Sequence, residues 1–298
     1  MDIATGVGIL GGIATICAIM VRFPFSVIMH GLPMGLRFAF TMRSVSRHMS
    51  LPTIDRSALA TALLAFASLP ATAESLPSGF VLLRELAPAI AQDMRYATPF
   101  NFTGAAVPGY RRGECVLTRI AADALIRVEK RLARQGYGLK LFDCYRPARA
   151  VAAFNDWVRR PGAADLGRIF HPGIARGDLV ARGYIAGNSS HSRGSTVDVG
   201  LVRAGSAALP TPGDAGPCDG PLATRPRETD LDLGTSFDCF SEKSALGHPG
   251  VTTEARRNRA ILAAAMSAEG FRGYSKEWWH FTLAKEPFPK TSFDFTIE

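Results

Sequence analysis

Two long segments predict helices, and the first places apolar residues at the spacing of an amphipathic helix. The first begins after Thr118, whose hydroxyl can cap a helix, and Gly136 provides its stop. Its apolar positions are 120, 121, 125, 128 and 132. The second follows Thr253 as a predicted cap and ends at Gly270. The first pattern predicts a helix that buries one face, and the second segment predicts a further helix.

Between and after these helices, the pattern changes to strand and loop character. Residues 139–145 predict a strand, and Pro147 fits the first turn of a helix that runs to about Arg160. Residues 204–236 are rich in Pro, Gly and Asp, which predicts a long loop. The aromatic run EWWHFTLA, which starts at Glu277, predicts a last strand. Helices and strands mix without regular β-α alternation, so we expect one α+β domain over residues 74–298.

The N-terminal quarter contains two uncharged apolar runs. Residues 3–21 approach the length of a membrane span, although many of them are Gly, Ala or Thr. Residues 49–73 combine a basic residue, an apolar run and an Ala-Thr-Ala cleavage site, the layout of a secretory signal. Either the true start is Met49 and residues 1–48 lie upstream of it, or residues 3–21 form a membrane anchor. Both interpretations predict an exported, periplasmic domain, with membrane contact only through a retained N-terminal segment.

Composition excludes some functional classes. Apolar residues make up 47% of the chain and charged residues 20%, as in ordinary globular proteins. The formal net charge is +8, and residues 1–73 hold five arginines against two aspartates. The remaining surplus is small and lacks a long Lys/Arg run, so we expect no nucleic-acid partner.

Four cysteines follow the targeting region, which indicates disulfides in an exported protein. They are Cys115, Cys144, Cys218 and Cys239. Three pairings are possible, and we favour Cys115–Cys144 with Cys218–Cys239. No CxxC pair is present, which argues against a zinc finger.

The stretch SSHSRGSTVD, residues 189–198, contains the first candidate chemistry. His191 and Asp198 lie on either side of Gly194, and a glycine turn before a strand can let both side chains converge. Imidazole and carboxylate are both zinc ligands, and a catalytic zinc takes three protein ligands plus water. Taken alone, the pair is more typical of a polar surface turn.

The segment KEWWHF offers a third ligand and a base. His280 can complete the ligand set, and Glu277 can take a proton from zinc-activated water. The alternative is a core strand whose Glu and His are merely solvated. Arg146, between a strand and a helix started by proline, can stabilise an oxyanion or can equally be a surface residue.

Together these residues resemble the zinc D-alanyl-D-alanine dipeptidases, the vancomycin-resistance type enzymes. The matching positions are Ser189, His191, Gly194, Thr196, Asp198 and the run Glu277–His280. Segments 95–104, 143–150, 237–238 and 292–295 also match, so the resemblance covers nearly all of the chain after about residue 80. It implies the hedgehog/D,D-peptidase fold, a single domain with a central antiparallel sheet flanked by helices.

The resemblance also implies roles for individual residues. One zinc ion per chain would bind His191, Asp198 and His280. Glu277 would be the general base and then the acid, and Arg146 would stabilise the tetrahedral intermediate. Asp238 would bind the free ammonium of the dipeptide, and Ser189 would contact the substrate. A longer peptide would leave the buried Asp238 carboxylate unpaired, which disfavours it.

Several alternatives remain open at this point. A related zinc D,D-carboxypeptidase would trim longer peptidoglycan stems, and a non-catalytic zinc-binding sensing module would not need Glu277. A serine acyl-enzyme is disfavoured because neither GxSxG nor SxxK follows residue 74. Cys144 replaces a glycine frequent in the family, and Cys115 and Cys218 are additions to its pattern. Export favours salvage of D-alanine from wall-derived dipeptide over antibiotic resistance. The sequence does not predict the oligomeric state.

Overall fold

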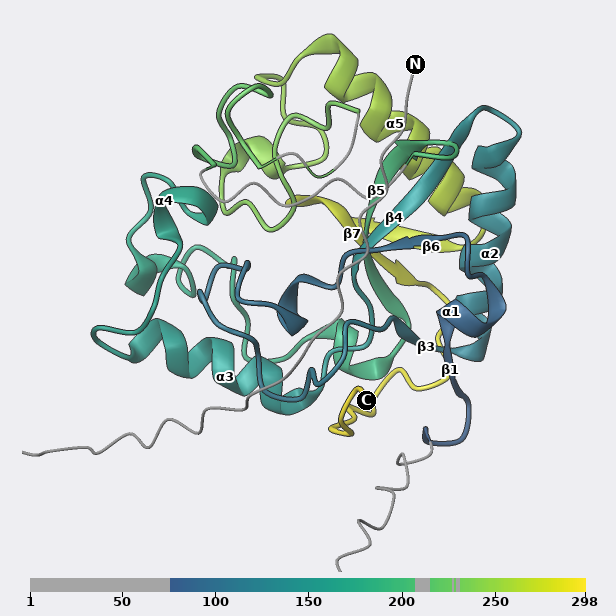
Figure 1. Ribbon diagram of the computed structural model, residues 1–298, viewed down its shortest axis with the longest axis horizontal. Coiled ribbons are helices and arrows are strands. Elements are labelled where there is room, and N and C mark those ends of the chain that lie inside the picture. The colour runs from purple at the N-terminus through teal and green to yellow at the C-terminus, as the bar shows by residue number, and fades with distance from the viewer. Residues whose placement is uncertain (1–75, 207–214, 227, 229–230) are drawn as a thin grey trace, which may run out of the picture. The chain divides into compact units, whose positions relative to one another are not determined.

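The computed structural model describes residues 76–206, 215–226, 228 and 231–298 (Figure 1). The predicted apolar run at 3–21 and the secretory signal at 49–73 therefore lie outside the described residues. The domain boundaries predicted from the sequence stay a prediction.

A five-stranded sheet forms the centre of the fold, in the order β2-β4-β5-β7-β6 (Figure 1). Neighbouring strands are antiparallel except β2 and β4, which are parallel. The sheet is therefore mixed, and the expected antiparallel sheet is wrong at this edge. The chain crosses from β2 to β4 through helix α2, and such a crossover returns the chain in the parallel direction. The strands are Ala91–Gln92 (β2), Tyr137–Asp143 (β4), Thr196–Arg203 (β5), Phe271–Tyr274 (β6) and Glu277–Leu283 (β7).

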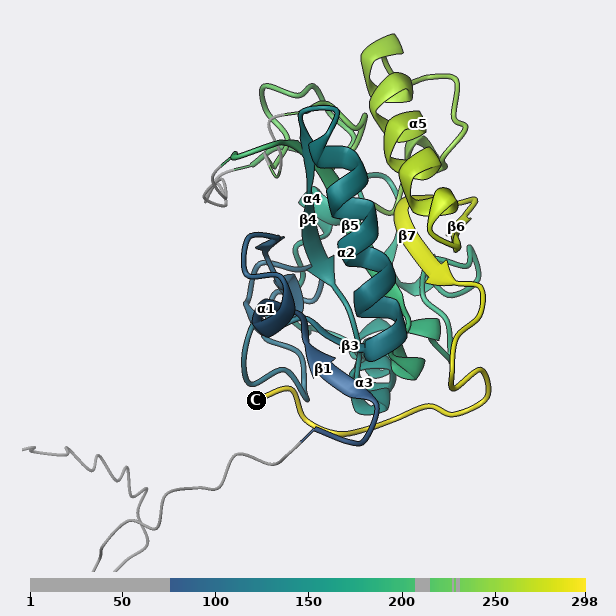
Figure 2. The same cartoon turned by 90° about the vertical axis from the view of Figure 1, so that its right-hand side faces the viewer.

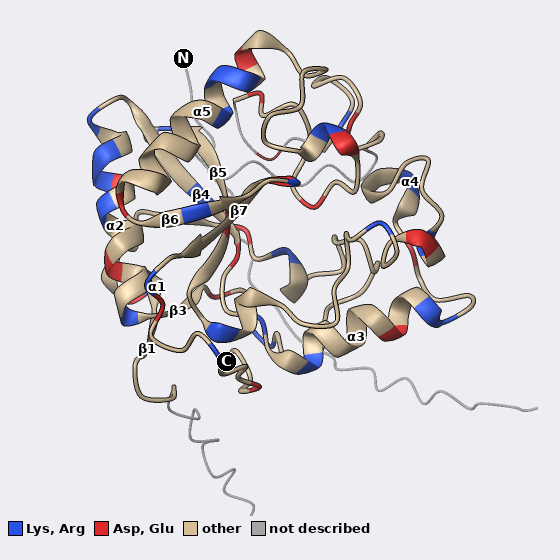
Figure 3. Ribbon diagram, turned by 180° about the vertical axis from the view of Figure 1, so that it is seen from behind, with Lys and Arg blue, Asp and Glu red and all other residues tan. Residues whose placement is uncertain are grey.

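Two long helices, α2 (Arg119–Ala133) and α5 (Thr253–Ala268), pack side by side against the sheet (Figure 2). Basic and acidic residues alternate along α2 (Figure 3). Two of its arginines, Arg127 and Arg131, donate to Glu269 at the end of α5, which joins the two helices. None of the described helices is long and apolar enough to cross a membrane.

The helix caps follow the predicted chemistry with one shift. Thr118 caps α2 by accepting from the Ala121 amide, as predicted. In α5 the cap is Thr252, which accepts from Ala255 at 3.0 Å, and the predicted Thr253 is the first helical residue. A cap side chain satisfies an amide three residues on, and two adjacent threonines made this position ambiguous. Of the apolar positions that predicted α2, 121, 125, 128 and 132 are buried, whereas Ile120 is 54% exposed and its predicted place on the buried face is wrong.

The connection between β4 and the next helix differs slightly from the prediction. The strand ends at Asp143, and α3 spans Ala148–Arg159 with Pro147 at its N-cap. Residues 144–146 thus form a short link instead of strand. Strand β5 ends at Arg203, and the described part of the predicted loop 204–236 contains no helix or strand. Smaller elements are β1 (Phe80–Leu82), α1 (Leu83–Leu86), β3 (Val116–Thr118) and α4 (Gly167–Phe170).

Both favoured disulfides are present, and all four sulfurs belong to fully buried residues. Cys115–Cys144 joins the residue before β3 to the residue after β4. Cys218–Cys239 joins the long loop to the segment that precedes α5. Each disulfide therefore ties together segments that are separated in sequence and contain no regular structure.

Candidate metal centre

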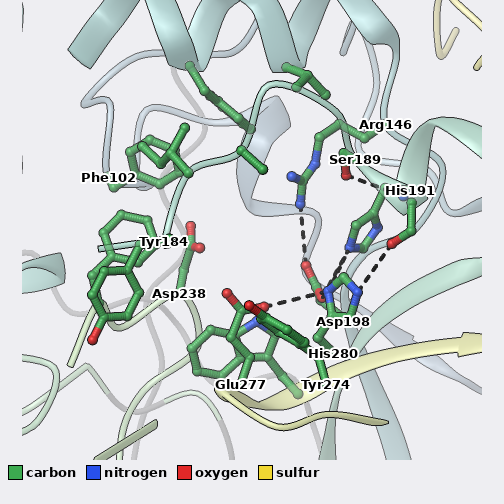
Figure 4. Close-up of a pocket in the computed structure, with 18 of the residues that line it drawn as sticks. Phe102, Arg146, Tyr184, Ser189, His191, Asp198, Asp238, Tyr274, Glu277 and His280 are labelled. Carbon is green, nitrogen blue, oxygen red and sulfur yellow. Dashed lines mark hydrogen bonds and ion pairs between the residues drawn. The ribbon is translucent and has the colours of Figure 1, made fainter. Parts of the chain in front are cut away.

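Three predicted ligands meet at one point in the structure (Figure 4). His191 Nε2 and His280 Nδ1 each lie 3.2 Å from Asp198 Oδ1. The two imidazole nitrogens are 3.3 Å apart. The sequence-predicted set His191, Asp198 and His280 therefore forms a compact triangle of donor atoms.

Strand register explains why two of these side chains meet. Asp198 on β5 lies directly opposite His280 on β7 in an antiparallel pair. Directly opposed residues project to the same face of a sheet, with their Cβ atoms about 5 Å apart. Asp143 on β4 lies opposite Asp198 on the other side, so three polar residues cross the sheet in one row.

His191 reaches the row from a 3₁₀ helix, Ser190–Arg193. The chain reverses at Gly194, which has a φ of 78°. A Cβ at this position would lie 2.2 Å from the Phe80 ring, so both the conformation and the space require glycine. This is the glycine turn that the sequence predicted.

The donor atoms fit a small divalent cation. His191 Nδ1 donates to the Cys144 carbonyl at 2.7 Å, and His280 Nε2 lies 3.3 Å from Ser190 Oγ. The Cys144 carbonyl leaves the lone pair of a neutral His191 on Nε2, the nitrogen that faces Asp198, and the buried Asp198 Oδ1 has no hydrogen-bond partner. Ligands of a tetrahedral zinc with bonds of about 2.0–2.1 Å lie roughly 3.3–3.4 Å apart, close to the observed spacing. Zinc would satisfy all three atoms at once.

Electrostatics favour the ionised form of the carboxylate ligand. Burial alone would raise the pKa of Asp198, but the two imidazoles hold that pKa well below its ordinary value. A carboxylate that stays ionised is available as a metal ligand.

Glu277 lies at the start of β7, next to the three donor atoms (Figure 4). Its Oε2 is 3.6 Å from His280 Nδ1, and the side chain is 14% exposed. Burial raises the pKa of the Glu277 carboxyl to about 7. Together with the donor atoms it lines a cavity of about 270 Å³. Glu277 can therefore exchange a proton with a molecule in this cavity.

Arg146 lies in the link between β4 and α3 and lines the same cavity. Its Nε donates to Asp143 Oδ2 at 2.9 Å, and its Nη2 lies 3.5 Å from Asp198 Oδ2. The guanidinium also sits 5.0 Å from the centre of the Tyr96 ring. These contacts fix a positive charge beside the predicted metal position.

Asp143 is a site residue that the sequence reasoning missed. It is fully buried, and its Oδ1 accepts from the Tyr110 hydroxyl at 2.7 Å. Its Oδ2 binds Arg146 and lies 3.5 Å from His191 Nδ1. An irregularity between Leu141 and Asp143 shifts the register, which no alternation pattern predicts. The only available signal was a carboxylate at the end of an apolar strand.

Replacing Asp143 with Asn keeps the shape and removes the charge that holds Arg146 and faces His191. We expect metal affinity and turnover to fall about 10- to 100-fold, the usual effect of losing an outer partner of a metal ligand. Competition with a chelating dye measures the affinity. Asp156→Asn, an exposed aspartate of α3 paired with Arg159, is the matched control. Wild-type affinity and turnover in Asp143→Asn would contradict this role.

Asp238 and Ser189 also line the cavity. Asp238 is 5% exposed, and its Oδ2 accepts from the Tyr96 hydroxyl at 3.0 Å. Burial raises the pKa of Asp238 well above its ordinary value, so a cationic ligand would stabilise its ionised form. Ser189 caps the 3₁₀ helix by accepting from the His191 amide. All seven predicted site residues therefore gather around one cavity.

The comparisons of this chain with known proteins all indicate the same family. A family model described as D-ala-D-ala dipeptidase matches residues 77–213 and 222–298. A D-alanyl-D-alanine dipeptidase of Enterococcus faecium is 36% identical over 220 residues, which cover 74% of this chain and 98% of that protein. A protein of the same name from Streptomyces coelicolor is 38% identical over 218 residues, covering 73% of this chain and 98% of the relative. The one from Escherichia coli is 30% identical over 192 residues, or 64% and 77% of the two chains.

Proposed function

The chain belongs to the D-Ala-D-Ala dipeptidase family, and on that premise we propose that it hydrolyses D-alanyl-D-alanine to free D-alanine with one zinc ion. The observation that carries the proposal is the gathering of His191, Asp198, His280 and Glu277 around one cavity. The proposal includes the hedgehog/D,D-peptidase fold for the α+β domain.

In the proposed mechanism, His191, Asp198 and His280 would hold the ion. Zinc bound there would supply Lewis acidity, which lowers the pKa of water to about 7 and polarises a carbonyl. Glu277 accepts the proton of the attacking water and then protonates the leaving amine. Arg146 stabilises the negative charge that develops on the carbonyl oxygen.

Substrate length is set at the other end of the cavity. Asp238 pairs with the free ammonium of the dipeptide, and the Tyr96 hydroxyl orients its carboxylate. Ser189 contacts the substrate from the rim of the metal centre. A longer stem peptide has an amide in place of the ammonium, which would leave the Asp238 carboxylate unpaired and buried.

Asp238→Asn removes the charge but keeps a side chain of the same size. We expect KM for D-Ala-D-Ala to rise roughly 10- to 100-fold, since hydrogen bonds to charged groups contribute about 1.5–3 kcal/mol. Steady-state kinetics with zinc in excess measure this KM, and the content of bound zinc should stay at the wild-type level. A KM equal to that of the wild type would remove Asp238 from the substrate site.

Release of free D-alanine from D-Ala-D-Ala by the purified full chain tests the function. We expect one zinc per chain and complete inhibition by a chelator, reversed by added zinc. Release only from a pentapeptide stem would instead indicate a D,D-carboxypeptidase. Bound zinc and bound dipeptide without turnover would indicate a sensing module, which Glu277 argues against because such a module needs no base.

Export to the periplasm and salvage of wall-derived dipeptide complete the proposal. Its support is the signal-like pattern at 49–73 and the two disulfides within the domain. A fusion of the first 80 residues to a reporter that is active only outside the cytoplasm is expected to be active. A fusion that stays cytoplasmic would reverse this part and favour a role on newly made dipeptide.

A further inference from the structure

The first disulfide lies directly behind a metal ligand. The carbonyl of Cys144 accepts the hydrogen bond of His191 Nδ1 at 2.7 Å, which determines the nitrogen that faces the metal. Cys144 belongs to the short link after β4, so no strand hydrogen-bond ladder holds it. Its sulfur is bonded to Cys115.

Cys115 is itself firmly held. Its amide donates to Gln92 Oε1 at 2.9 Å, and its carbonyl accepts from the Leu83 amide at 2.9 Å. The next residue along, Val116, accepts from the Tyr145 amide at 2.9 Å. The disulfide therefore connects the carbonyl that orients His191 to a fixed part of the fold.

The second disulfide lies directly beside Asp238, the residue predicted to bind the ammonium of the substrate. Cys239 follows Asp238 in sequence and is bonded to Cys218. Asp238 has a φ of 62°, in the left-handed region that disfavours residues other than glycine, so its surroundings must hold it there.

Both segments joined by the second disulfide are anchored to α4. The Cys218 amide donates to the Ile169 carbonyl at 2.8 Å, and the Phe240 amide donates to the Phe170 carbonyl at 2.8 Å. The Cys218 carbonyl accepts from the Ser236 amide at 2.9 Å. The loop that carries Asp238 is thus held before Asp238 by the Ser236 hydrogen bond, and after it by the disulfide at Cys239 and the Phe240 hydrogen bond.

We propose that each disulfide positions one end of the site. Cys115–Cys144 fixes the metal end through the carbonyl that orients His191. Cys218–Cys239 fixes the end that receives the substrate ammonium, through the backbone of Asp238. The second half rests on the proposed function, whereas the first half rests on the metal ligands alone. Since all four cysteines are fully buried, these are positioning elements and do not contact the substrate.

The variant that lacks one disulfide serves as the control for the variant that lacks the other. They close loops of similar length, with sequence separations of 29 and 21 residues. Chain entropy therefore predicts nearly equal losses of overall stability when either is removed. A purely global role would affect zinc binding and substrate binding alike in both variants, whereas local positioning predicts opposite patterns.

The experiment uses the full chain as two variants, Cys115→Ala/Cys144→Ala and Cys218→Ala/Cys239→Ala. In the first, we expect zinc affinity to fall about 10- to 100-fold, with KM for D-Ala-D-Ala at saturating zinc within about twofold of the wild type. In the second, we expect zinc affinity within about twofold of the wild type and KM raised about tenfold, as for a displaced binding group. Dye competition and steady-state kinetics supply the two readouts.

Leu132→Ala, a cavity variant in the buried face of α2, controls for lost stability alone. If an alanine pair does not fold, a Val/Ala pair that refills the volume of the sulfurs carries the same test. Equal changes in both disulfide variants, or no change in either, would overturn the inference. So would a pair that fails to fold in both versions, because the crosslink then serves the whole fold.

A failure of the proposed function can be distinguished from a failure of this inference about the disulfides. It would appear as a wild-type protein that releases no D-alanine. In that case zinc affinity alone decides the inference. A fall confined to the Cys115–Cys144 variant supports it, and an equal fall in both variants overturns it.

Discussion

Glu277→Gln is expected to lower kcat for D-Ala-D-Ala about 10²- to 10⁴-fold, the range that a positioned general acid–base contributes. The substitution keeps the size of the side chain and removes its ability to take a proton. Glu277 Oε2 lies 3.6 Å from His280 Nδ1, and Glu277 is not one of the three clustered donors. Zinc content should therefore remain at the wild-type level, and the loss should fall on kcat more than on KM.

Glu277→Ala is the stricter version of this experiment, because alanine cannot orient a water molecule by hydrogen bonding. Glu242→Gln, an exposed glutamate in the short 3₁₀ helix Glu242–Ser244, provides the matched control and should leave turnover unchanged. Metal analysis and kinetics on the same preparation separate the two roles. Turnover that survives both substitutions at Glu277 would show that another group performs the proton transfer.

His280→Ala is expected to abolish turnover by removing one of the three proposed zinc ligands. The variant leaves Asp198 Oδ1 and His191 Nε2 as the only donors of the set, too few for a stable site. For the wild-type protein, added zinc should raise Tm and a chelator should lower it, because a ligand that binds only the folded state stabilises it by mass action. In His280→Ala, Tm should respond to neither addition.

A thermal melt with and without zinc, combined with metal analysis, tests this expectation. His248→Ala, in the loop before α5, serves as the control and should keep the wild-type response to zinc. If His280→Ala still bound one zinc per chain, His280 would not be a ligand and the assignment of the site would be wrong.

The sequence predicted which residues gather around the cavity better than it predicted their surroundings. His191, Asp198 and His280 have side chains whose chemistry points to zinc, and Gly194 marks the turn that lets them converge. The helix α2 was predicted because its buried positions repeat at helical spacing. The two-residue strand β2 is too short to produce any pattern, so its parallel pairing could not be predicted.

Asp143 illustrates the same limit within the site. Its side chain reaches the row of polar residues only because β4 shifts register after Leu141, and that shift depends on tertiary pairing with β5. The position of Asp238 beside Tyr96 likewise depends on contact between segments 142 residues apart. Residue types and short spacings predict which groups do the chemistry, whereas long-range pairing decides which groups support them.

The opposed positions of Asp198 and His280 also bear on the order of folding. His191 and His280 are 89 residues apart in sequence, so an unfolded chain offers an incoming ion no complete set of ligands. Closing such a loop is entropically unfavourable, and β5 and β7 must pair before the third ligand arrives. A bound ion would therefore stabilise a sheet that has already formed and would not nucleate its folding. An interaction that forms after the folding transition state slows unfolding and leaves the folding rate nearly unchanged, so bound zinc would lengthen the lifetime of the native enzyme.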